Sequence, residues 1–515
     1  MSIRFSLLFA AFLLPMPLLT EAAGLADDRA AMVRGLASQV GRVLGAASAC
    51  PNIARPRIKS IAGKISDIIK SSASNENEIA ALMDVLDRSE SEGARALAAR
   101  QMDCGAAERQ LADLENASTP QQSSAPPPAA FQASAFAGQA AAVRGITPTE
   151  IRFGISAPFS GPSKDLGQQM RIGIEAAFRA ANDAGGVNGR MLRLIAADDG
   201  YEPARTAETM KQLYEKDQVF GFVGNVGTPT AVVALPFALD RRVLFYGAFT
   251  GASLLRRDPP DRYVFNYRAS YAEETDAVVR YLVKVRKLKP EQIVVFAQQD
   301  AYGDAGFAGV AKAMRALRGG DGGYILRAGY PRNTIDVDAA IGQLKAHKTP
   351  IKAVVMVGTY RAAAKFIEKT RDSYPGLIYT NVSFVGSTSL RDELMLLGPK
   401  YASGVIITQV VPAVDGYSSL VLQYKSALAK YFGGEAPDYV SLEGYVAAQI
   451  LIEALKRAGP QFDTEKLVDT FESLRDFDLG LGTTISFGRS EHQGSHKVWG
   501  TQITETGKFE PIDLQ

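Results

Sequence analysis

The sequence contains few of the residues on which metal and thiol chemistry depend. Among its 515 residues there are only three histidines and two cysteines. We find no local grouping of a nucleophile, a base and an orienting residue, no phosphate-binding glycine loop and no dinucleotide-binding glycine pattern. These absences argue against an enzyme, and they predict neither a cofactor nor a bound metal ion.

An excess of charge of either sign is missing too. Lys and Arg total 57 and Asp and Glu total 55, so the formal net charge is only +2. Because no global positive field attracts phosphates, we expect no nucleic-acid partner. Hydrophobic residues make up 46% and charged residues 22% of the chain, which is typical of a folded globular protein.

Long hydrophobic runs are also absent. One apolar stretch, residues 5–19, is too short for a typical membrane-spanning helix and is interrupted by Pro15 and Pro17. It follows Arg4 and precedes small residues around Ala22, which is the pattern of a secretory signal peptide. We therefore expect residues 1–22 to be a signal peptide and the protein to be exported. An uncleaved membrane anchor is the alternative.

The two cysteines, Cys50 and Cys104, both lie in the first fifth of the chain. In an oxidising compartment outside the cytoplasm such a pair can close a disulfide. We expect that bridge, and two separate thiols are the alternative.

Three segments differ in their residue patterns. Residues 23–116 show helical spacing, with an isoleucine stripe at positions 58, 61, 65, 68 and 69 that we interpret as core. Residues 117–148 are rich in Pro, Ala, Ser and Gln, and we expect a disordered linker. From Thr149 onward, short apolar runs such as 151–155, 192–195, 219–223 and 243–246 alternate with helical segments.

This alternation predicts parallel sheets covered by helices on both faces. Because some ten strands are too many for one compact sheet, we expect two α/β lobes. In such sheets ligands bind beyond the carboxyl ends of the strands, so the turns at those ends are candidate sites.

Two turns have suitable residues. Residues 224–230 combine Gly224 and Gly227 with Thr228, which is either an N-cap satisfying its own helix or part of a seat for an anion. Residues 299–303 place Tyr302 after another strand, either as packing of the turn or as a ring that contacts a ligand.

Five short motifs follow one another in the order typical of one protein family. They are residues 151–162, residues 184–189, Asp198-Asp199 with Pro203 and Ala207 beyond, residues 224–230 and residues 299–303. Through these motifs the chain from about Thr149 to its C-terminus resembles the branched-chain amino-acid binding proteins of ABC importers, the type I periplasmic binding proteins. Residues 25–145 show no comparable resemblance.

The resemblance implies a two-lobed α/β fold, in which two parallel-sheet lobes joined by a crossover hinge close around a small solute. We expect this domain to span 149–515, after the helical segment 23–116 and the linker 117–148. Lobe 1 would comprise about 149–269 and 410–484, and lobe 2 about 270–409 and 485–515.

The resemblance also assigns ligand contacts. In lobe 1, Thr228 and the backbone of Val226 match the positions that receive the ligand carboxylate. Ala248 and Thr250 match a paired backbone and hydroxyl contact of the same lobe.

In lobe 2, Tyr302 matches an aromatic contact, and Thr359 or Tyr360 the region of a further tyrosine. The acidic residue that holds the ligand's ammonium in this family falls near Ser387, where residues 386–388 contain no carboxylate. Leu166 likewise replaces a usual aromatic residue. Because a buried ammonium without a counter-charge is costly, a carboxylate, amide or aromatic acid is expected in place of leucine or valine.

We therefore expect a periplasmic solute-binding protein that delivers a small amino-acid-like, amide or carboxylate ligand to the inner-membrane permease subunits of an ABC importer. The alternative is a periplasmic ligand sensor or envelope scaffold that uses the same fold to bind a protein partner. The long segment before the fold motivates this alternative.

Overall fold

The computed structural model describes residues 37–38, 40–72, 76–98, 104–105, 107–108, 111, 143–318 and 324–514. The chain divides into two compact units, residues 1–135 and 136–515. The expected signal peptide and most of the expected linker lie outside the described residues.

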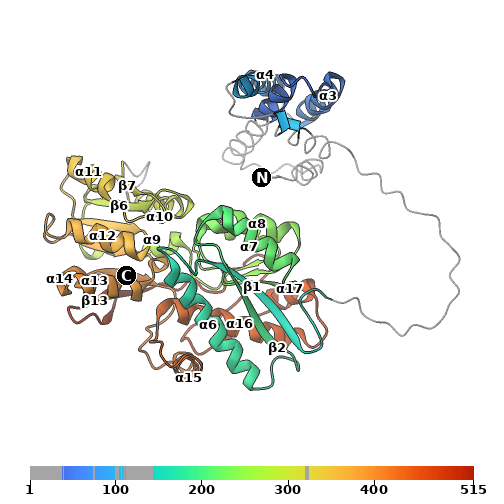
Figure 1. The fold of residues 1–515 in the computed structure, drawn as a ribbon. Coiled ribbons are helices and arrows are strands. Elements are labelled where there is room, and N and C mark those ends of the chain that lie inside the picture. Colours follow the sequence, from blue (N-terminus) through green and yellow to red (C-terminus); the bar gives the residue numbers. More distant parts are fainter. Residues whose placement is uncertain are drawn as a thin grey trace, which may run out of the picture. The chain divides into compact units, whose positions relative to one another are not determined.

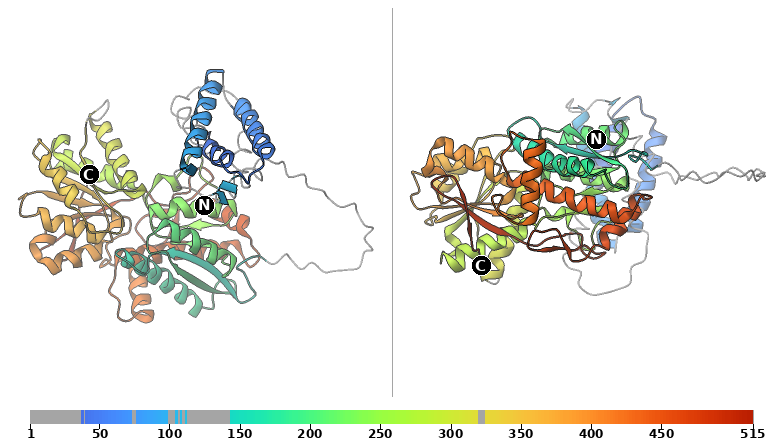
Figure 2. Two further views of the ribbon diagram at one scale, coloured as in Figure 1. Left: turned by 45° about the horizontal axis from the view of Figure 1, so that its top comes forward. Right: turned by 90° about the horizontal axis from the view of Figure 1, so that it is seen from below.

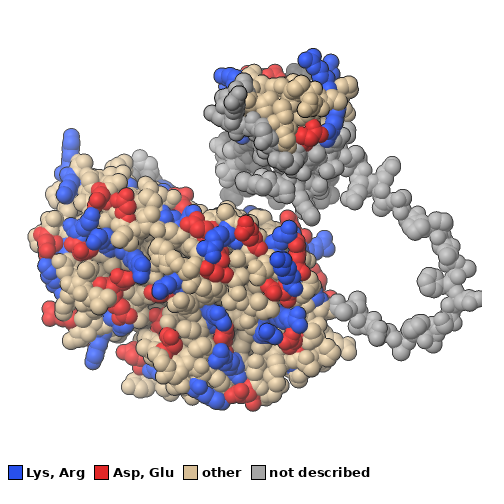
Figure 3. Space-filling model, in the orientation of Figure 1, with Lys and Arg blue, Asp and Glu red and all other residues tan. Residues whose placement is uncertain are grey.

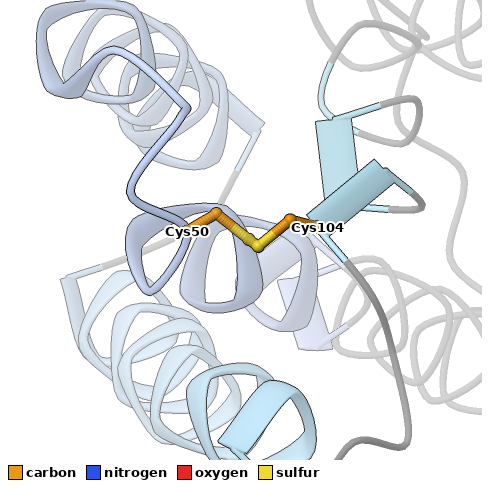
Figure 4. Close-up of a disulfide and its surroundings, with 2 residues drawn as sticks. All are labelled: Cys50 and Cys104. Carbon is orange, nitrogen blue, oxygen red and sulfur yellow. A yellow bond between two sulfur atoms is a disulfide. The ribbon is translucent and has the colours of Figure 1, made fainter.

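The N-terminal unit is helical in its described part (Figure 1). Residues 40–48 form a helix, followed by α3 (Arg55–Ser72) and α4 (Glu76–Ala98). Ile58 and Ile61 of the isoleucine stripe are buried in a core that also contains Leu82 and Leu86. The side chains of the other three stripe isoleucines lie outside the described part. A disulfide joins Cys50 to Cys104 (Figure 4).

The first lobe of the larger unit is built on a five-stranded parallel sheet with the strand order β2-β1-β3-β4-β5. Its strands are β1 (Glu150–Ala157), β2 (Met191–Asp198), β3 (Gly221–Val223), β4 (Phe245–Tyr246) and β5 (Val264–Phe265). Most positions of these strands are buried, as expected for a parallel sheet covered on both faces.

Helices cover both faces of this sheet (Figure 1). They are α6 (Lys164–Asp183), α7 (Pro203–Glu215), α8 (Thr228–Asp240), α15 (Ser419–Tyr431), α16 (Tyr439–Ala458) and α17 (Thr464–Glu472). The crossover through α6 leads from β1 to β2, and the crossover through α7 leads back past β1 to β3. Because both crossovers are right-handed, they place α6 on one face and α7 on the other. On these faces α6 packs against α15 and α16, and α7 packs against α8.

The second lobe contains a seven-stranded sheet with the order β14-β13-β10-β9-β8-β6-β7. Its strands are β6 (Ile293–Gln298), β7 (Arg327–Tyr330), β8 (Ala353–Val357), β9 (Ile378–Asn381), β10 (Ile406–Gln409), β13 (Trp499–Ile503) and β14 (Phe509–Ile512). The first five are parallel, and β13 and β14 are antiparallel additions at one edge.

The second sheet is likewise covered by helices. They are α9 (Tyr271–Arg280) with a π-helical continuation (Tyr281–Val285), α10 (Ala301–Arg318), α11 (Asp338–Ala346), α12 (Tyr360–Thr370), α13 (Ser387–Leu397) and α14 (Pro399–Ala402). Short 3-10 turns lie at Ser253–Leu255, Pro290–Gln292 and Ser383–Val385. Of these helices, α9 packs against α10 and α11 against α12.

The chain passes between the lobes three times: after β5, after β10 and before β13. A small antiparallel pair, β11 (Phe477–Asp478) and β12 (Thr484–Ile485), precedes the last crossing. Figure 2 shows the first lobe in teal, green and red beside the second in yellow and orange. The expectation of a two-lobed α/β fold behind an all-helical segment is confirmed.

Charged side chains of both signs are interspersed over the visible face of the larger unit (Figure 3), in keeping with the low net charge of the chain. Within the described ranges, no helix combines the length and the apolar character that a membrane crossing requires.

Candidate functional site

Two threonine hydroxyls meet at the carboxyl edge of the first sheet. Thr228 follows β3, Thr250 follows β4, and their Oγ1 atoms are 2.7 Å apart. Both side chains are fully buried. These residues, which we call the threonine pair, lie beyond the strand ends where open parallel sheets bind ligands.

Thr228 does not cap its helix. The N-cap of α8 is Gly227, without a side-chain hydrogen bond, and Thr228 is the first helical residue. The capping interpretation of Thr228 is therefore wrong, because its hydroxyl interacts with Thr250 instead. The first turn of α8 contains Pro229 and no acidic side chain, so the positive end of the helix dipole is not neutralised there.

Gly227 makes this geometry possible. Its φ is 111°, and a Cβ atom would collide with the ring of Tyr201 and the hydroxyl of Thr230. No other residue adopts this conformation without strain.

The backbones of Val226 and Ala248 already have partners within their loops. The Val226 amide donates to the Ser156 carbonyl at 3.3 Å, and its carbonyl accepts from the Thr230 hydroxyl. The Ala248 carbonyl accepts from the amide of Thr250 at 2.8 Å. These two residues shape the loops that hold the threonine pair.

Five aromatic rings from both lobes, which we call the aromatic cluster, pack together near the threonine pair. Phe249 of the first lobe stacks on Phe384 of the second at 5.0 Å between ring centres. Phe384 also contacts Tyr302 at 4.6 Å, and Tyr201 at 6.1 Å. Tyr271, 5.4 Å from Tyr302, completes the cluster.

Tyr271 links the aromatic cluster to the threonine pair. Burial raises the pKa of its phenol, while the Arg268 charge and the nearby hydroxyls of Thr250 and Thr228 lower it. The Tyr271 hydroxyl itself is buried and has no hydrogen-bond partner among the described residues. Tyr271 therefore brings a third hydroxyl to the two threonine hydroxyls.

Tyr302 resembles Tyr271 in this respect. Its hydroxyl is buried and, among the described residues, has no hydrogen-bond partner. Burial raises the pKa of Tyr302 well above its usual value, so the phenol remains a neutral donor. A buried hydroxyl without a hydrogen-bond partner destabilises the fold. A polar group of a bound ligand would remove this penalty by forming the missing hydrogen bond.

Of the other predicted residues of the second lobe, Thr359 reaches the aromatic cluster only through a chain of hydrogen bonds, and Ser387 lies in a network apart from it. The Thr359 amide donates to the Tyr330 hydroxyl at 3.0 Å, and that hydroxyl donates to Gln298, which in turn donates to Tyr201. Ser387 donates to Gln409 at 3.1 Å and interacts with none of the other predicted residues.

Tyr360 lies at another contact between the lobes. Burial, followed by the carboxylate of Asp165 in the first lobe, raises the pKa of Tyr360. Leu166, beside Asp165, reaches so close to Gly386 that a Cβ atom there would collide with it. Leucine thus fills the space in which an aromatic residue was expected.

The lobes are also joined by an ion-pair network at Arg332. Its guanidinium lies 2.8 Å from Glu202 of the first lobe and 3.3 Å from Asp300 of the second. Beside it, the Asn333 amide donates to the Gly200 carbonyl at 3.0 Å.

Sequence reasoning missed several residues at this site. They are the aromatic residues Tyr201, Phe249, Tyr271 and Phe384, and the buried Arg268 beside Phe249 with its ion-pair partners Glu274 and Glu443. Arg268 and Tyr271 follow β5, a strand of two residues that leaves almost no alternation to detect. Glu443 lies in α16, where nearly every position is buried. An acidic residue within this apolar run was the sequence signal that could have indicated a functional role for Glu443.

A cavity of about 780 Å³ lies next to this site. Its lining includes Gly251 and Tyr271, with Arg256, Gly309 and Gln493 around them. None of the eight predicted ligand residues lines it. Within the described ranges, no group of His, Cys, Asp and Glu residues has the arrangement of a metal site.

Two α/β lobes with hydroxyl-bearing loops at facing edges define a class of proteins that bind small solutes between their lobes. The chain belongs to the periplasmic binding protein family, whose model matches residues 150–508. The family resemblance is thereby confirmed, and the family consists of solute-binding proteins and not of enzymes. Membership implies a periplasmic or extracellular location.

Individual proteins agree with this assignment. The solved structure of a possible leucine/isoleucine/valine-binding protein from Rhodopirellula baltica SH 1 is similar, with 40% identity and a TM-score of 0.68 over 71% of this chain and 97% of that one. An amino acid binding protein of Pseudomonas aeruginosa is 26% identical, over 60% of this chain and 79% of its own.

A branched chain amino acid ABC transporter from Thermus thermophilus, solved with bound valine, shares the fold at 20% identity. Its TM-score is 0.61, over 71% of this chain and 96% of that one. The match to the family leaves the N-terminal helical unit outside.

Proposed function

We propose that this protein is the exported solute-binding component of an ABC importer. It binds a small amino-acid-like, amide or carboxylate solute in the cleft between its lobes and closes over it. The threonine pair carries this proposal: two buried hydroxyls, 2.7 Å apart, lie at the carboxyl edge of one sheet and near aromatic rings from the other lobe.

The threonine pair suits a carboxylate. Thr228, Thr250 and Tyr271 each bring a hydroxyl that can donate, and the start of α8 adds the positive end of a helix dipole. Hydrogen bonds to a charged acceptor are stronger than those between neutral groups. The first lobe therefore provides the initial seat for the solute.

Closure then adds the second lobe. Tyr302 offers an unpartnered hydroxyl, and Phe384 and Phe249 offer apolar faces for the body of the solute. The ion pairs of Arg332 with Glu202 and Asp300 hold the lobes together. In this proposal Thr228, Thr250 and Tyr302 contact the solute directly, and Val226, Ala248, Thr359, Tyr360 and Ser387 act mainly by shaping the cleft.

The proposal includes export through a signal peptide at residues 1–22, cleaved near Ala22, and delivery to inner-membrane permease subunits. The amino-acid binding proteins among the relatives support a solute of this size and polarity. N-terminal sequencing of the protein recovered from the periplasm tests the cleavage: a mature start near residue 23 is expected, and an intact N-terminus would contradict it.

Isothermal titration of the full chain with a panel of amino acids, amides and aromatic acids tests the ligand class. At least one member is expected to bind with a dissociation constant of about 10 μM or tighter, in the range of specific small-molecule sites. Silence across the panel, with a protein that melts cooperatively, would overturn the proposal. Uptake of the bound compound by cells with and without the protein then tests the importer role.

A second candidate function is a periplasmic sensor or envelope scaffold. The N-terminal unit, with a core and a disulfide of its own, lies outside the family match and favours this candidate. If cells without the protein take up the bound compound at the normal rate, while an envelope protein co-purifies with residues 23–116, the second candidate replaces the first.

A further inference from the structure

Arg268 lies at the same sheet edge as the threonine pair. Thr228 follows β3, Thr250 follows β4, and Arg268 comes shortly after β5, the next strand in the sheet. Its side chain is only 1% exposed. Three adjacent strands thus each provide a hydrogen-bond donor beyond their carboxyl ends.

The guanidinium of Arg268 is incompletely paired. Its Nη2 atom donates to Glu274 at 3.2 Å and to Ser383. Its Nε and Nη1 atoms are buried and have no hydrogen-bond partner among the described residues. Because buried donors are almost always paired, Nε and Nη1 leave room for a hydrogen-bond acceptor, although Nη1 has the Glu443 carboxylate 3.5 Å away.

Glu274 cannot serve as that acceptor. Its carboxylate already accepts from the Ser383 amide at 2.8 Å, the Ser383 hydroxyl at 3.1 Å, the Thr408 hydroxyl and Arg268 itself. Glu274 is therefore a fixed counter-ion of the second lobe.

Glu443 is a different kind of partner. Its Oε1 atom lies 3.5 Å from Nη1 of Arg268, an ion pair in which Nη1 forms no hydrogen bond. Burial raises the pKa of Glu443 to about 7, against the opposing charges of Arg268 and Arg256 and with a further rise from Glu274. The Tyr267 phenol also lies within electrostatic reach of it. Near neutral pH this counter-ion is therefore easily protonated.

Aromatic rings connect Arg268 to the candidate cleft. Its guanidinium carbon lies 4.8 Å from the ring centre of Phe249 and 5.8 Å from that of Tyr271. Tyr271 is the residue whose phenol lies near the hydroxyls of the threonine pair. The positive charge thus borders the same rings that would enclose the body of the solute.

We infer that Arg268 recognises an anionic group of the solute, and that the protein prefers carboxylates without an ammonium group, such as 2-oxo acids, to the matching amino acids. This inference rests on the proposed function. An ammonium group would meet the buried charge of Arg268, the carboxylates Glu274 and Glu443 already face that charge, and residues 386–388 offer no further acid.

When the anion approaches Arg268, Glu443 takes up a proton, so that the buried charges remain balanced. The proton comes from solvent, and no other bond changes. Binding of an anion should therefore weaken as the pH rises above about 7, by up to tenfold per pH unit.

Paired probes with one carbon skeleton test the preference. Isothermal titration of the full chain compares L-leucine with 4-methyl-2-oxopentanoate, and L-phenylalanine with phenylpyruvate, between pH 6 and 8.5. In at least one pair the 2-oxo acid is expected to bind at least tenfold tighter. Tighter binding of the amino acids would overturn the inference and leave the proposed function intact. If neither member of either pair binds, the inference is overturned. Binding of another compound from the panel of amino acids, amides and aromatic acids would then still support the proposed function.

Variants separate ligand recognition from a purely structural role. Arg268→Met should remove the preference for the 2-oxo acid, and Arg268→Lys should retain part of it. Glu443→Gln, which keeps the shape, should abolish the pH dependence and tighten binding of the 2-oxo acid at pH 8.5 by at least tenfold. The matched control is Glu472→Gln, which changes a buried carboxylate in α17 that pairs with Arg262. This variant should leave the preference for the 2-oxo acid unchanged.

If Arg268→Met does not fold, the inference is tested by the binding affinity and pH profile of Glu443→Gln alone. Loss of binding in Glu443→Gln would mean that Glu443 holds an ammonium group, and it would overturn the inference. A pH profile and preference identical to those of the wild type would mean that Arg268 and Glu443 act only as structure, and would overturn it as well.

Discussion

Two buried tyrosines of the second lobe differ in a way that separates stability from binding. The Tyr302 hydroxyl has no hydrogen-bond partner among the described residues. The Tyr330 hydroxyl meets both Gln298 and the Thr359 amide. A buried hydroxyl without a partner costs about 1–3 kcal/mol, whereas one with partners stabilises the fold. We propose that the Tyr302 hydroxyl has no partner within the protein because it forms its hydrogen bond with the bound solute.

Tyr302→Phe should therefore raise the unfolding free energy of the free protein by about 1 kcal/mol, because it removes an unpaired buried hydroxyl. The same change should weaken solute binding by roughly tenfold, since one hydrogen bond is lost. Urea unfolding and isothermal titration measure the two effects. Tyr330→Phe is the control and should lower stability. If Tyr302→Phe were destabilising, or bound the solute like the wild type, the assigned role of Tyr302 would be wrong.

At the scale of elements, the loop from β3 into α8 determines the site. Gly227 has φ 111° and lies against the ring of Tyr201 and the hydroxyl of Thr230. This loop leads directly into Thr228, so any shift of its backbone moves one member of the threonine pair. The site therefore depends on this loop as well as on the hydroxyls themselves.

Gly227→Ala should lower the unfolding free energy by about 2 kcal/mol or more, because the new Cβ collides with its neighbours in a strained conformation. Solute affinity should fall with it. Gly342→Ala, inside α11 where a Cβ has open space, is the control and should stabilise by about 0.5–1 kcal/mol. Equal melting curves for Gly227→Ala and the wild type would show that this loop is more tolerant than the structure implies.

The elements themselves were largely predictable from the sequence. Alternating apolar runs and helical spacing predicted the parallel sheets, and Ile58 and Ile61 lie in a core as the stripe indicated. The two-residue strand β5 was missed because two residues show no periodicity.

The candidate site was less predictable. The resemblance directed attention to Thr228 and Thr250, which the structure brings together, but the partner of the Thr228 hydroxyl depends on a tertiary contact that local capping rules do not contain. Arg268 and Glu274 are six residues apart, but Glu443 comes from the distant helix α16, and no local spacing could have joined it to them. The lobe boundaries and the individual ligand contacts remain predictions.

At the scale of the whole molecule, the described part of each unit has a hydrophobic core of its own. The N-terminal unit has a small helical core and the disulfide between Cys50 and Cys104, whereas the core of residues 136–515 extends through both lobes. A small core depends strongly on a covalent link, because the link reduces the entropy of the unfolded chain.

Replacing both cysteines by serine should therefore destabilise the N-terminal unit by about 4 kcal/mol, the loss expected for a closed loop whose ends are 54 positions apart in the sequence. Differential scanning calorimetry should show that its transition moves to lower temperature or disappears. The transition of residues 136–515 and the affinity for solute should stay unchanged. A shift of both transitions would mean that the two units stabilise each other.

The central claim is that the threonine pair seats the carboxylate of a solute held between the lobes. The direct test is isothermal titration of wild type and Thr228→Val/Thr250→Val with the tightest-binding compound of the panel. Thr380→Val serves as the control, because its buried hydroxyl bonds to the Val354 carbonyl within the second sheet. We predict that the double variant binds at least about 100-fold more weakly, through the loss of two hydrogen bonds to a charged acceptor, while the control binds normally. Equal affinity of the folded double variant and the wild type would contradict the account.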